Sequence, residues 1–247
     1  MKKILKLILS TIIIISLFVS SVYADTSAKQ KKSNYGIQLS QIERMKSNIP
    51  KNQKKAFLNM SYNEKTERMI NISEKYKTGD RLSMADSNFV ILYETEAEQS
   101  VAKSAAIRTK SGKTRTSGEG AAIYKKKNGV EAVFYPQIWV SHPTWDTMSY
   151  RGDHTLEIWS GKSKLKKVTL KTYHTAYGLA GTSAGLFVVY DGSISSSFTS
   201  KKSSYSMDKT KKYSGAIVWK TFTYSTAIIK TDNSSFNINS ADYNWYW

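Results

Sequence analysis

Apolar residues recur at helical spacing between residues 38 and 78 of this chain, at intervals of three or four positions. Pro50 interrupts this pattern, because proline cannot continue a helix from its interior. Ser61 and Glu64 have the spacing of a capping box, in which the two side chains bind free amide groups at a helix start. The pattern therefore predicts helices on both sides of Pro50, the second of them ending near Gly79.

From Ala121 onward the pattern changes to strands. An Asn-Gly pair at 128–129 lies between two apolar runs, which is the strongest short signal of a β-hairpin. A second hairpin is expected from residues 154–160 and 165–175, with its turn at Gly161. In its returning strand, apolar residues alternate with lysine and threonine, as on a sheet with one buried and one wet face.

Other apolar runs are assigned less directly. Residues 89–93 are short enough to be either a strand or a buried connector. Residues 186–190 read as a strand that ends at an Asp-Gly pair, and residues 213–230 as one long strand-like run. The serine-rich residues 193–206 are expected to form a loop or an edge strand, and Phe236 with Ile238 indicates a last short strand.

These elements predict a mainly β fold: an antiparallel β-sandwich or partly closed barrel, preceded by a short α-helical N-terminal segment, α+β overall. The expected organisation is a signal peptide at 1–24, a mostly helical segment at 25–100, a basic flexible connector at 101–120 and an antiparallel β domain at 121–247. Cleavage within 101–130 would release the helical segment as a propeptide.

The first residues of the chain predict export. Lys2, Lys3 and Lys6 precede an apolar run at 7–19, and Val22-Tyr23-Ala24 has the small or aliphatic residues that a signal peptidase reads. The chain contains no cysteine, which is unusual for a secreted domain. We therefore expect a secreted protein, extracellular or loosely associated with the cell wall, of a Gram-positive-type bacterium.

The formal charge of +18 is unevenly distributed along the chain. Residues 101–130 contain eight basic residues and one acidic residue, a local excess of +7. The predicted polyanion-binding residues are Lys103, Arg108, Lys110, Lys113, Arg115, Lys125, Lys126 and Lys127. Outside a cell their partners would be an anionic cell-wall polymer, an anionic lipid or a polysaccharide rather than intracellular nucleic acid. A solvated charged loop is the alternative.

One short motif resembles that of serine hydrolases. Residues 181–185 read Gly-Thr-Ser-Ala-Gly, and Asp191-Gly192 resembles the Asp-Gly pair of patatin-type lipases. The resemblance makes Ser183 a candidate nucleophile and Asp191 its partner. However, a nucleophile elbow needs a helix after the serine, whereas a strand-like run follows here. A plain connection between two strands is the alternative.

No metal, cofactor or paired-acid site emerges from spacing. His142, His154 and His174 lack the intervals of a helical or single-strand zinc site. Acidic residues occur in the β region, including Glu131 and Glu157, but no spacing singles out a pair for glycoside hydrolysis. The integrin-type tripeptide Arg-Gly-Asp at 151–153 is expected in a loop before a strand, where Gly-Asp is also ordinary turn chemistry.

Two strand regions resemble the insertable hairpins of β-pore-forming toxins. They carry Ile194 and Phe198, then Phe222 and Tyr224, among serine and threonine. The aromatic residues 243–247 either meet a membrane interface or close the sandwich. The leading hypothesis is a non-enzymatic binder of extracellular polyanions. The alternatives are a membrane-active toxin or bacteriocin-like protein, and a serine hydrolase using Ser183.

Overall fold

The computed structural model describes residues 39–108, 117–119, 122–144, 147–179, 185–214 and 218–240. The signal peptide predicted at 1–24 and the aromatic residues 243–247 lie outside these ranges. The chain divides into two units, residues 1–41 and residues 42–247. The second unit contains every strand of the described residues.

Helices occupy the first part of this second unit. After helical residues that extend to 47, the helices are α2 (Lys51–Leu58), α3 (Tyr62–Lys75) and α4 (Met84–Arg108). Pro50 is the N-cap of α2, as expected of a residue that starts a helix well and continues one badly. The capping box of α3 is confirmed: the Ser61 side chain accepts from the Glu64 amide, and the Ser61 amide donates to Glu64 Oε2 at 2.7 Å. The helix prediction is therefore correct around Pro50.

Residues 89–93 are helical, so the expectation of a strand or connector was wrong. They lie in α4, where Phe89, Val90, Ile91 and Tyr93 are all buried. A helix surrounded on several sides buries a continuous apolar run, which removes the periodicity that would identify it. α4 also continues to Arg108, so the first residues of the segment predicted as a flexible connector are helical.

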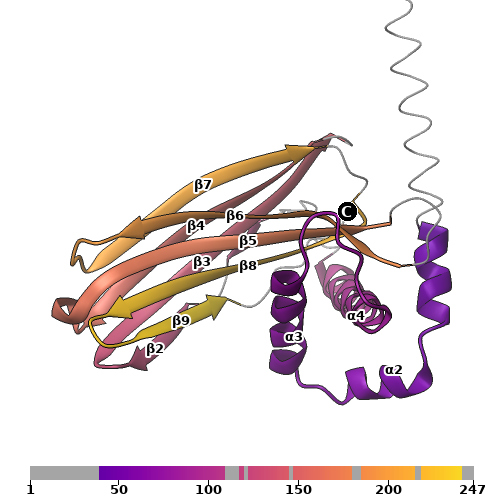
Figure 1. The fold of residues 1–247 in the computed structure, drawn as a ribbon, viewed down its shortest axis with the longest axis horizontal. Helices are drawn as coiled ribbons and strands as arrows, with labels where there is room; N and C mark the ends of the chain where they lie inside the picture. The colour runs from indigo at the N-terminus through magenta and orange to yellow at the C-terminus, as the bar shows by residue number, and fades with distance from the viewer. Residues whose placement is uncertain are drawn as a thin grey trace, which may run out of the picture. The chain divides into compact units, whose positions relative to one another are not determined.

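Two antiparallel sheets face each other and form a sandwich-like α+β fold without a closed barrel, as predicted (Figure 1). The first, sheet B, contains β1 (Ser117–Glu119), β2 (Ile123–Lys127), β3 (Val130–Thr144), β4 (Thr147–Ser160) and β7 (Ser204–Ser214). The second, sheet A, has the order β6 (Phe187–Phe198), β5 (Leu165–Gly178), β8 (Lys220–Thr231) and β9 (Ser235–Ser240). Helices cover one end of the outer face of sheet A.

One of the two predicted hairpins exists. β2 and β3 pair across the 128–129 turn, where Asn128 and Gly129 have φ values of 55° and 72°. Both positive values are those of a type I′ turn. β4 and β5, by contrast, do not pair: residues 161–164 carry the chain from sheet B to sheet A through the 3₁₀ helix η1 (Lys162–Lys164). Alternation identifies a strand, but it does not identify the strand's partner.

Several strand bounds differ from the predicted ones. β6 continues through Asp191 and Gly192 instead of ending there, and the serine-rich residues beyond them belong to edge strands β6 and β7. The long run at 213–230 is the end of β7 followed by β8. The last short strand is confirmed as β9, with Phe236 and Ile238 facing the core.

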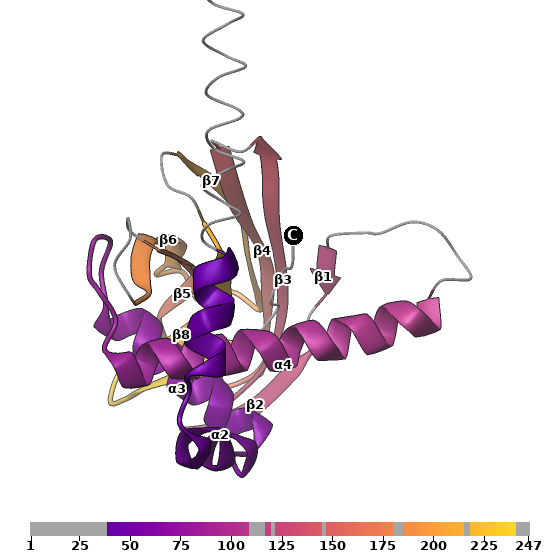
Figure 2. The ribbon, with the colours of Figure 1, turned by 90° about the vertical axis from the view of Figure 1, so that its right-hand side faces the viewer.

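The molecule has two apolar cores. One fills the space between the sheets, and the other lies between the helices and the outer face of sheet A. In the second core, Tyr93 of α4 packs edge-on against Phe222 of β8 at a centroid distance of 6.2 Å. The Tyr224 hydroxyl donates to Glu74 of α3 at 2.8 Å. Figure 2 shows α2, α3 and α4 gathered at this end of the sheets.

The connection between α3 and α4 pairs with the start of β6. The Gly79 amide donates to Val188 O at 2.8 Å, and the Val188 amide donates to Asp80 O at 3.0 Å. The Leu82 amide donates to Leu186 O at 2.8 Å. These backbone bonds attach the helices to the sandwich in addition to the shared core.

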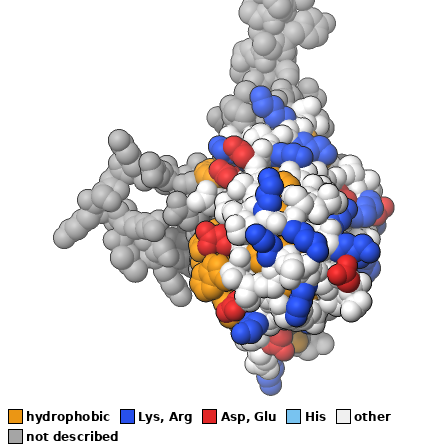
Figure 3. Space-filling view, turned by 90° about the vertical axis from the view of Figure 1, so that its left-hand side faces the viewer, with side chains coloured by type: hydrophobic (Ala, Val, Ile, Leu, Met, Phe, Trp, Pro, Cys, Tyr) orange, Lys and Arg blue, Asp and Glu red, His pale blue; other side chains and the backbone are white. Residues whose placement is uncertain are grey.

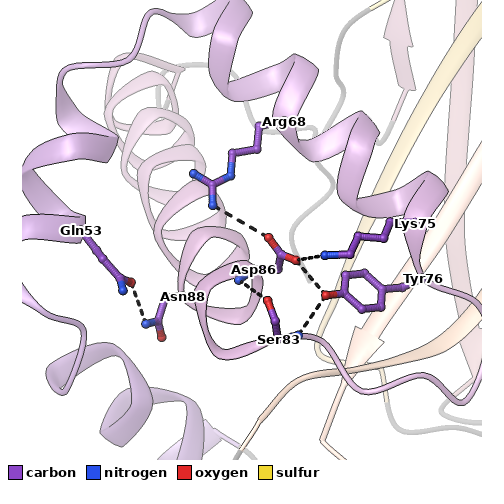
Figure 4. A network of polar contacts seen from close by, with 7 residues as sticks. All are labelled: Gln53, Arg68, Lys75, Tyr76, Ser83, Asp86 and Asn88. Atoms are coloured by element: carbon purple, nitrogen blue, oxygen red, sulfur yellow. Dashed lines mark hydrogen bonds and ion pairs between the residues drawn. The ribbon is translucent and has the colours of Figure 1, made fainter.

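Asp86 in the first turn of α4 ties the helices to one another (Figure 4). Its carboxylate accepts from Lys75 Nζ at 2.9 Å and from the Tyr76 hydroxyl at 2.8 Å, and Arg68 lies 3.8 Å away. Burial alone would raise the pKa of Asp86, but the hydrogen bonds from Lys75, Tyr76 and Ser83 outweigh it and lower that pKa.

Candidate functional site

Ten lysines of the described residues, nine exposed and one half-buried, gather at the end of the sandwich far from the helices. We call this surface the lysine end; its members are Lys125, Lys126, Lys127, Lys162, Lys164, Lys166, Lys167, Lys201, Lys202 and Lys230. They lie on the strand ends and connections between β2 and β3, β4 and β5, β6 and β7, and β8 and β9. Figure 3 views this end and shows basic side chains spread across it, with acidic ones mostly toward its margins.

Close backbone packing brings these connections together. A Cβ on Gly161 would lie 2.1 Å from Gly129 O, so the turn at 128–129 and the connection at 161–164 touch. The Lys164 ammonium lies over Gly129, and Lys201 Nζ donates to Ser163 O. Three stretches of sequence that are far apart therefore form one surface.

Few acidic groups offset this charge. Among the described residues at this end, Lys126 Nζ forms an ion pair with Glu131 Oε2 at 3.7 Å. Lys125 Nζ donates to Asn237 O at 2.8 Å, which ties β2 to β9 across the sandwich. Asp232 is the acidic residue on the β8–β9 turn. A surface with this excess of ammonium groups attracts polyanions at range, within about 8 Å at physiological salt.

Two exposed aromatic side chains border the lysine end. Trp159 of β4 is 60% exposed and Tyr124 of β2 is 50% exposed, on the outer face of sheet B. Their ring centroids are 5.9 Å apart with an angle of 46° between the planes. Tyr124 directly precedes three lysines of β2, and Trp159 is three residues before Lys162.

Two carboxylates hold these rings. The Tyr124 hydroxyl donates to Glu131 Oε1 at 2.5 Å, and Trp159 Nε1 donates to Glu157 Oε2 at 3.2 Å. The hydrogen bond from Tyr124 lowers the pKa of Glu131, so this carboxylate stays ionised. Glu157 also accepts from Tyr135 at 3.4 Å. The result is a fixed arrangement of two rings and two acceptors on an open surface.

The Arg-Gly-Asp tripeptide lies inside β4 rather than in the predicted loop. Arg151 makes a two-point ion pair with Asp208 of β7, at 2.6 and 2.7 Å, and lies 4.8 Å from the centroid of Trp139. The Asp208 pair raises the pKa of Arg151. Extended strand geometry and paired side chains make this tripeptide part of the sheet.

Polar side chains also lie inside the sandwich. His154 and His174 are both fully buried, on β4 and β5. Burial lowers the pKa of His154 to about 4 and that of His174 to about 3, so both are neutral. His174 stacks on Tyr150 at 4.5 Å, and Tyr190 stacks on Tyr213 at 3.9 Å. Side-chain contacts of His154 with Thr172 and of His174 with Tyr213 cross between the two sheets, so this cluster joins the layers.

The structure brings together only part of the predicted polyanion site. Lys125, Lys126 and Lys127 belong to the lysine end, together with seven lysines that sequence reasoning did not select. Lys103 and Arg108 are on α4, and their side chains are outside the described part of the chain. The last three predicted members, Lys110, Lys113 and Arg115, fall outside the described residues altogether.

Ser183 of the hydrolase-like motif also falls outside the described residues. The element that follows the motif is strand β6, not the helix that a nucleophile elbow requires. Asp191 lies within β6, where it pairs with Lys77 at 3.1 Å.

The apolar residues of the toxin-like strands are covered. Ile194 and Phe198 pack on the core between the sheets, whereas Phe222 and Tyr224 lie beneath the helices. Within the part of the chain that is described, the helices are too short or too polar to cross a bilayer. The same residues contain no cluster of three or more histidine and acidic side chains placed to bind a metal ion.

The lysine end and its aromatic border are thus the part of the described surface with the most distinct chemistry. It combines many ammonium groups with exposed rings and carboxylate acceptors. No protein-family model matches this chain, and no curated protein sequence matches it.

Proposed function

We propose that the protein is a non-enzymatic binder of extracellular or cell-envelope polyanions and that the lysine end is its contact surface. The observation that carries the proposal is the convergence of ten lysines, nine of them exposed, around four connections, with Glu131 as the acidic partner of Lys126 there among the described residues. Clustered ammonium groups bind a polyanion by displacing its counterions, so affinity falls steeply with salt.

The spread of the lysine end across several connections suits an extended polymer better than a small molecule, which would need a concave site. The export signal expected at residues 1–24 would place the protein among teichoic acids, acidic polysaccharides and anionic headgroups.

Elution from heparin resin in a salt gradient tests the proposal. The triple variant Lys127→Glu, Lys162→Glu, Lys202→Glu removes charge from three different connections of the lysine end. The matched control Lys51→Glu, Lys55→Glu, Lys212→Glu changes the total charge equally at exposed sites elsewhere. Elution of the first variant at much lower salt than both the control and the unmodified protein supports the proposal.

Two results would overturn it. If both triple variants elute at the same salt concentration, total charge rather than the lysine end governs binding. If the unmodified protein is not retained at low salt, or stays bound at about 1 M salt, the interaction is not an electrostatic one of this kind.

A further inference from the structure

We propose that Tyr124 and Trp159, with Glu131 and Glu157, form a sugar-stacking site, and that the polymer held by the lysine end is an anionic polysaccharide. This inference rests on the proposed function and names its ligand class. It starts from the exposure of two large rings, 60% for Trp159 and 50% for Tyr124, that an ordinary sheet surface would not require.

A β-bulge sets the position of Trp159. Glu131 pairs with Ser160 and Ala132 pairs with Ile158, so Trp159 is the extra residue on β4. A bulge redirects a side chain locally and is over-represented near functional sites. Hydrogen bonds to Glu157 and Glu131 then fix the indole and the phenol, which reduces the entropy lost when a ligand binds.

The chemistry of the site fits a pyranose ring. The C–H groups on one face of a sugar carry partial positive charge and meet the electron-rich face of an aromatic ring. The hydroxyl groups at its edge are donors, and an ionised carboxylate accepts their hydrogen bonds strongly. Lys126 lies on the same face of β2 as Tyr124, two residues and about 7 Å further along the strand, where it can contact anionic groups of the same sugar chain.

The same carboxylates favour a sugar over a lipid surface. Aromatic side chains do prefer the membrane interface, but inserting Trp159 and Tyr124 would desolvate Glu157 and Glu131, which they contact. A sugar chain uses these acceptors instead of burying them.

Calorimetric titration with two probes tests the inference: a heparin oligosaccharide and inorganic polyphosphate, which is a polyanion without sugar rings. Trp159→Ala should weaken heparin binding about tenfold and leave polyphosphate binding unchanged, because only the sugar uses the ring. Trp159→Phe, which keeps an aromatic face, should restore most of the heparin affinity. Because residue 159 is exposed, the variant should fold, and its circular dichroism checks this.

Equal effects of Trp159→Ala on both probes, or no effect on either, would overturn the sugar site while leaving the polyanion proposal intact. Absence of binding to both probes by the unmodified protein would instead overturn the polyanion proposal. Vesicles of phosphatidylglycerol test whether the rings contact a membrane instead. Tryptophan fluorescence would then shift with vesicles but not with heparin, and Trp159→Phe would remove the shift. That result would refute the sugar site.

Discussion

His154 and Thr172 connect the two sheets of the sandwich through their side chains. His154 Nε2 of β4 lies 2.6 Å from Thr172 Oγ1 of β5, and Thr172 continues to Ser225 of β8 at 3.2 Å. The Gln137 amide donates to His154 Nδ1 at 3.1 Å, so the neutral ring carries its proton on Nε2 and donates it to Thr172. The hydrogen bond that Nδ1 accepts from Gln137 therefore requires a neutral histidine.

The stability of the fold should consequently fall in mild acid. The folded-state pKa values of His154 and His174, about 4 and about 3, lie below the ordinary value of 6.5. The unfolded chain therefore takes up protons first, and this contribution is complete above pH 6.5 and is lost as the pH falls toward 4 and 3. We expect a loss of about 2 kcal/mol per histidine between pH 6.5 and pH 5.

Urea unfolding at pH 7.5, 6 and 5 measures this loss. The paired carboxylates Asp86 and Asp208 have pKa values below the ordinary 3.8, so their own loss of stability begins at lower pH. His174→Gln should reduce the slope of unfolding free energy against pH over this window. An unfolding free energy that stays constant from pH 7.5 to pH 5 would contradict the prediction.

Gly152 leaves the space that the His154–Thr172 contact occupies. A Cβ at this position would lie 2.1 Å from Thr172 Oγ1 and 2.7 Å from His154 Nε2. Gly152→Ala should therefore lower the unfolding free energy by about 1–3 kcal/mol, as overpacked cores do. Ser149→Ala, on the outer face of the same strand, should change it by less than about 0.5 kcal/mol. Equal urea midpoints for both variants would show that the contact can move aside.

Asp86 should contribute more to stability than an exposed ion pair does. Asp86→Ala removes the acceptor of Lys75 and Tyr76, and hydrogen bonds to a charged group suggest a loss of about 2 kcal/mol. The control Glu43→Ala removes an exposed partner 3.8 Å from Lys46, which is worth little. Urea unfolding of both variants at pH 7 compares them. An equally small effect would mean that the helices do not depend on this carboxylate.

Local patterns predicted elements better than their arrangement. The capping box at Ser61 and the Asn-Gly turn at 128–129 are short-range features, and both are confirmed. The prediction of a hairpin after Ser160 was wrong, because residues 161–164 suit a hairpin turn as well as a crossing between the sheets. Which strand lies beside β5 depends on contacts with β6 and β8, which follow later in the chain.

The lysine end shows the same limit for the site. A count of charge along the chain selects residues 101–130, because it groups residues that are neighbours in sequence rather than in space. In an antiparallel sandwich, alternate connections return to the same end, so Lys162, Lys202 and Lys230 join Lys127 there. The sequence signal that could have identified this surface was the position of these lysines close to predicted turns. The proximity of Trp159 and Tyr124 could not be predicted without the register of β2, β3 and β4.

Gly161 should hold the lysine end together, and a second glycine provides its control. Both Gly161 and Gly79 have positive φ values, 78° and 95°, so alanine at either site costs about 1 kcal/mol of backbone strain. Only at Gly161 would the added Cβ meet another backbone, 2.1 Å from Gly129 O, whereas nothing lies within 4 Å of it at Gly79. Gly161→Ala should therefore separate the 128–129 turn from the 161–164 connection.

The Gly161→Ala variant should have a lower urea midpoint than the Gly79→Ala variant. It should also elute from heparin at lower salt, because Lys127 and Lys162 would move apart. Gly79→Ala, in the connection before α4, should elute with the unmodified protein. If the two variants lose equal stability and elute together, the contact between these connections does not shape the binding surface.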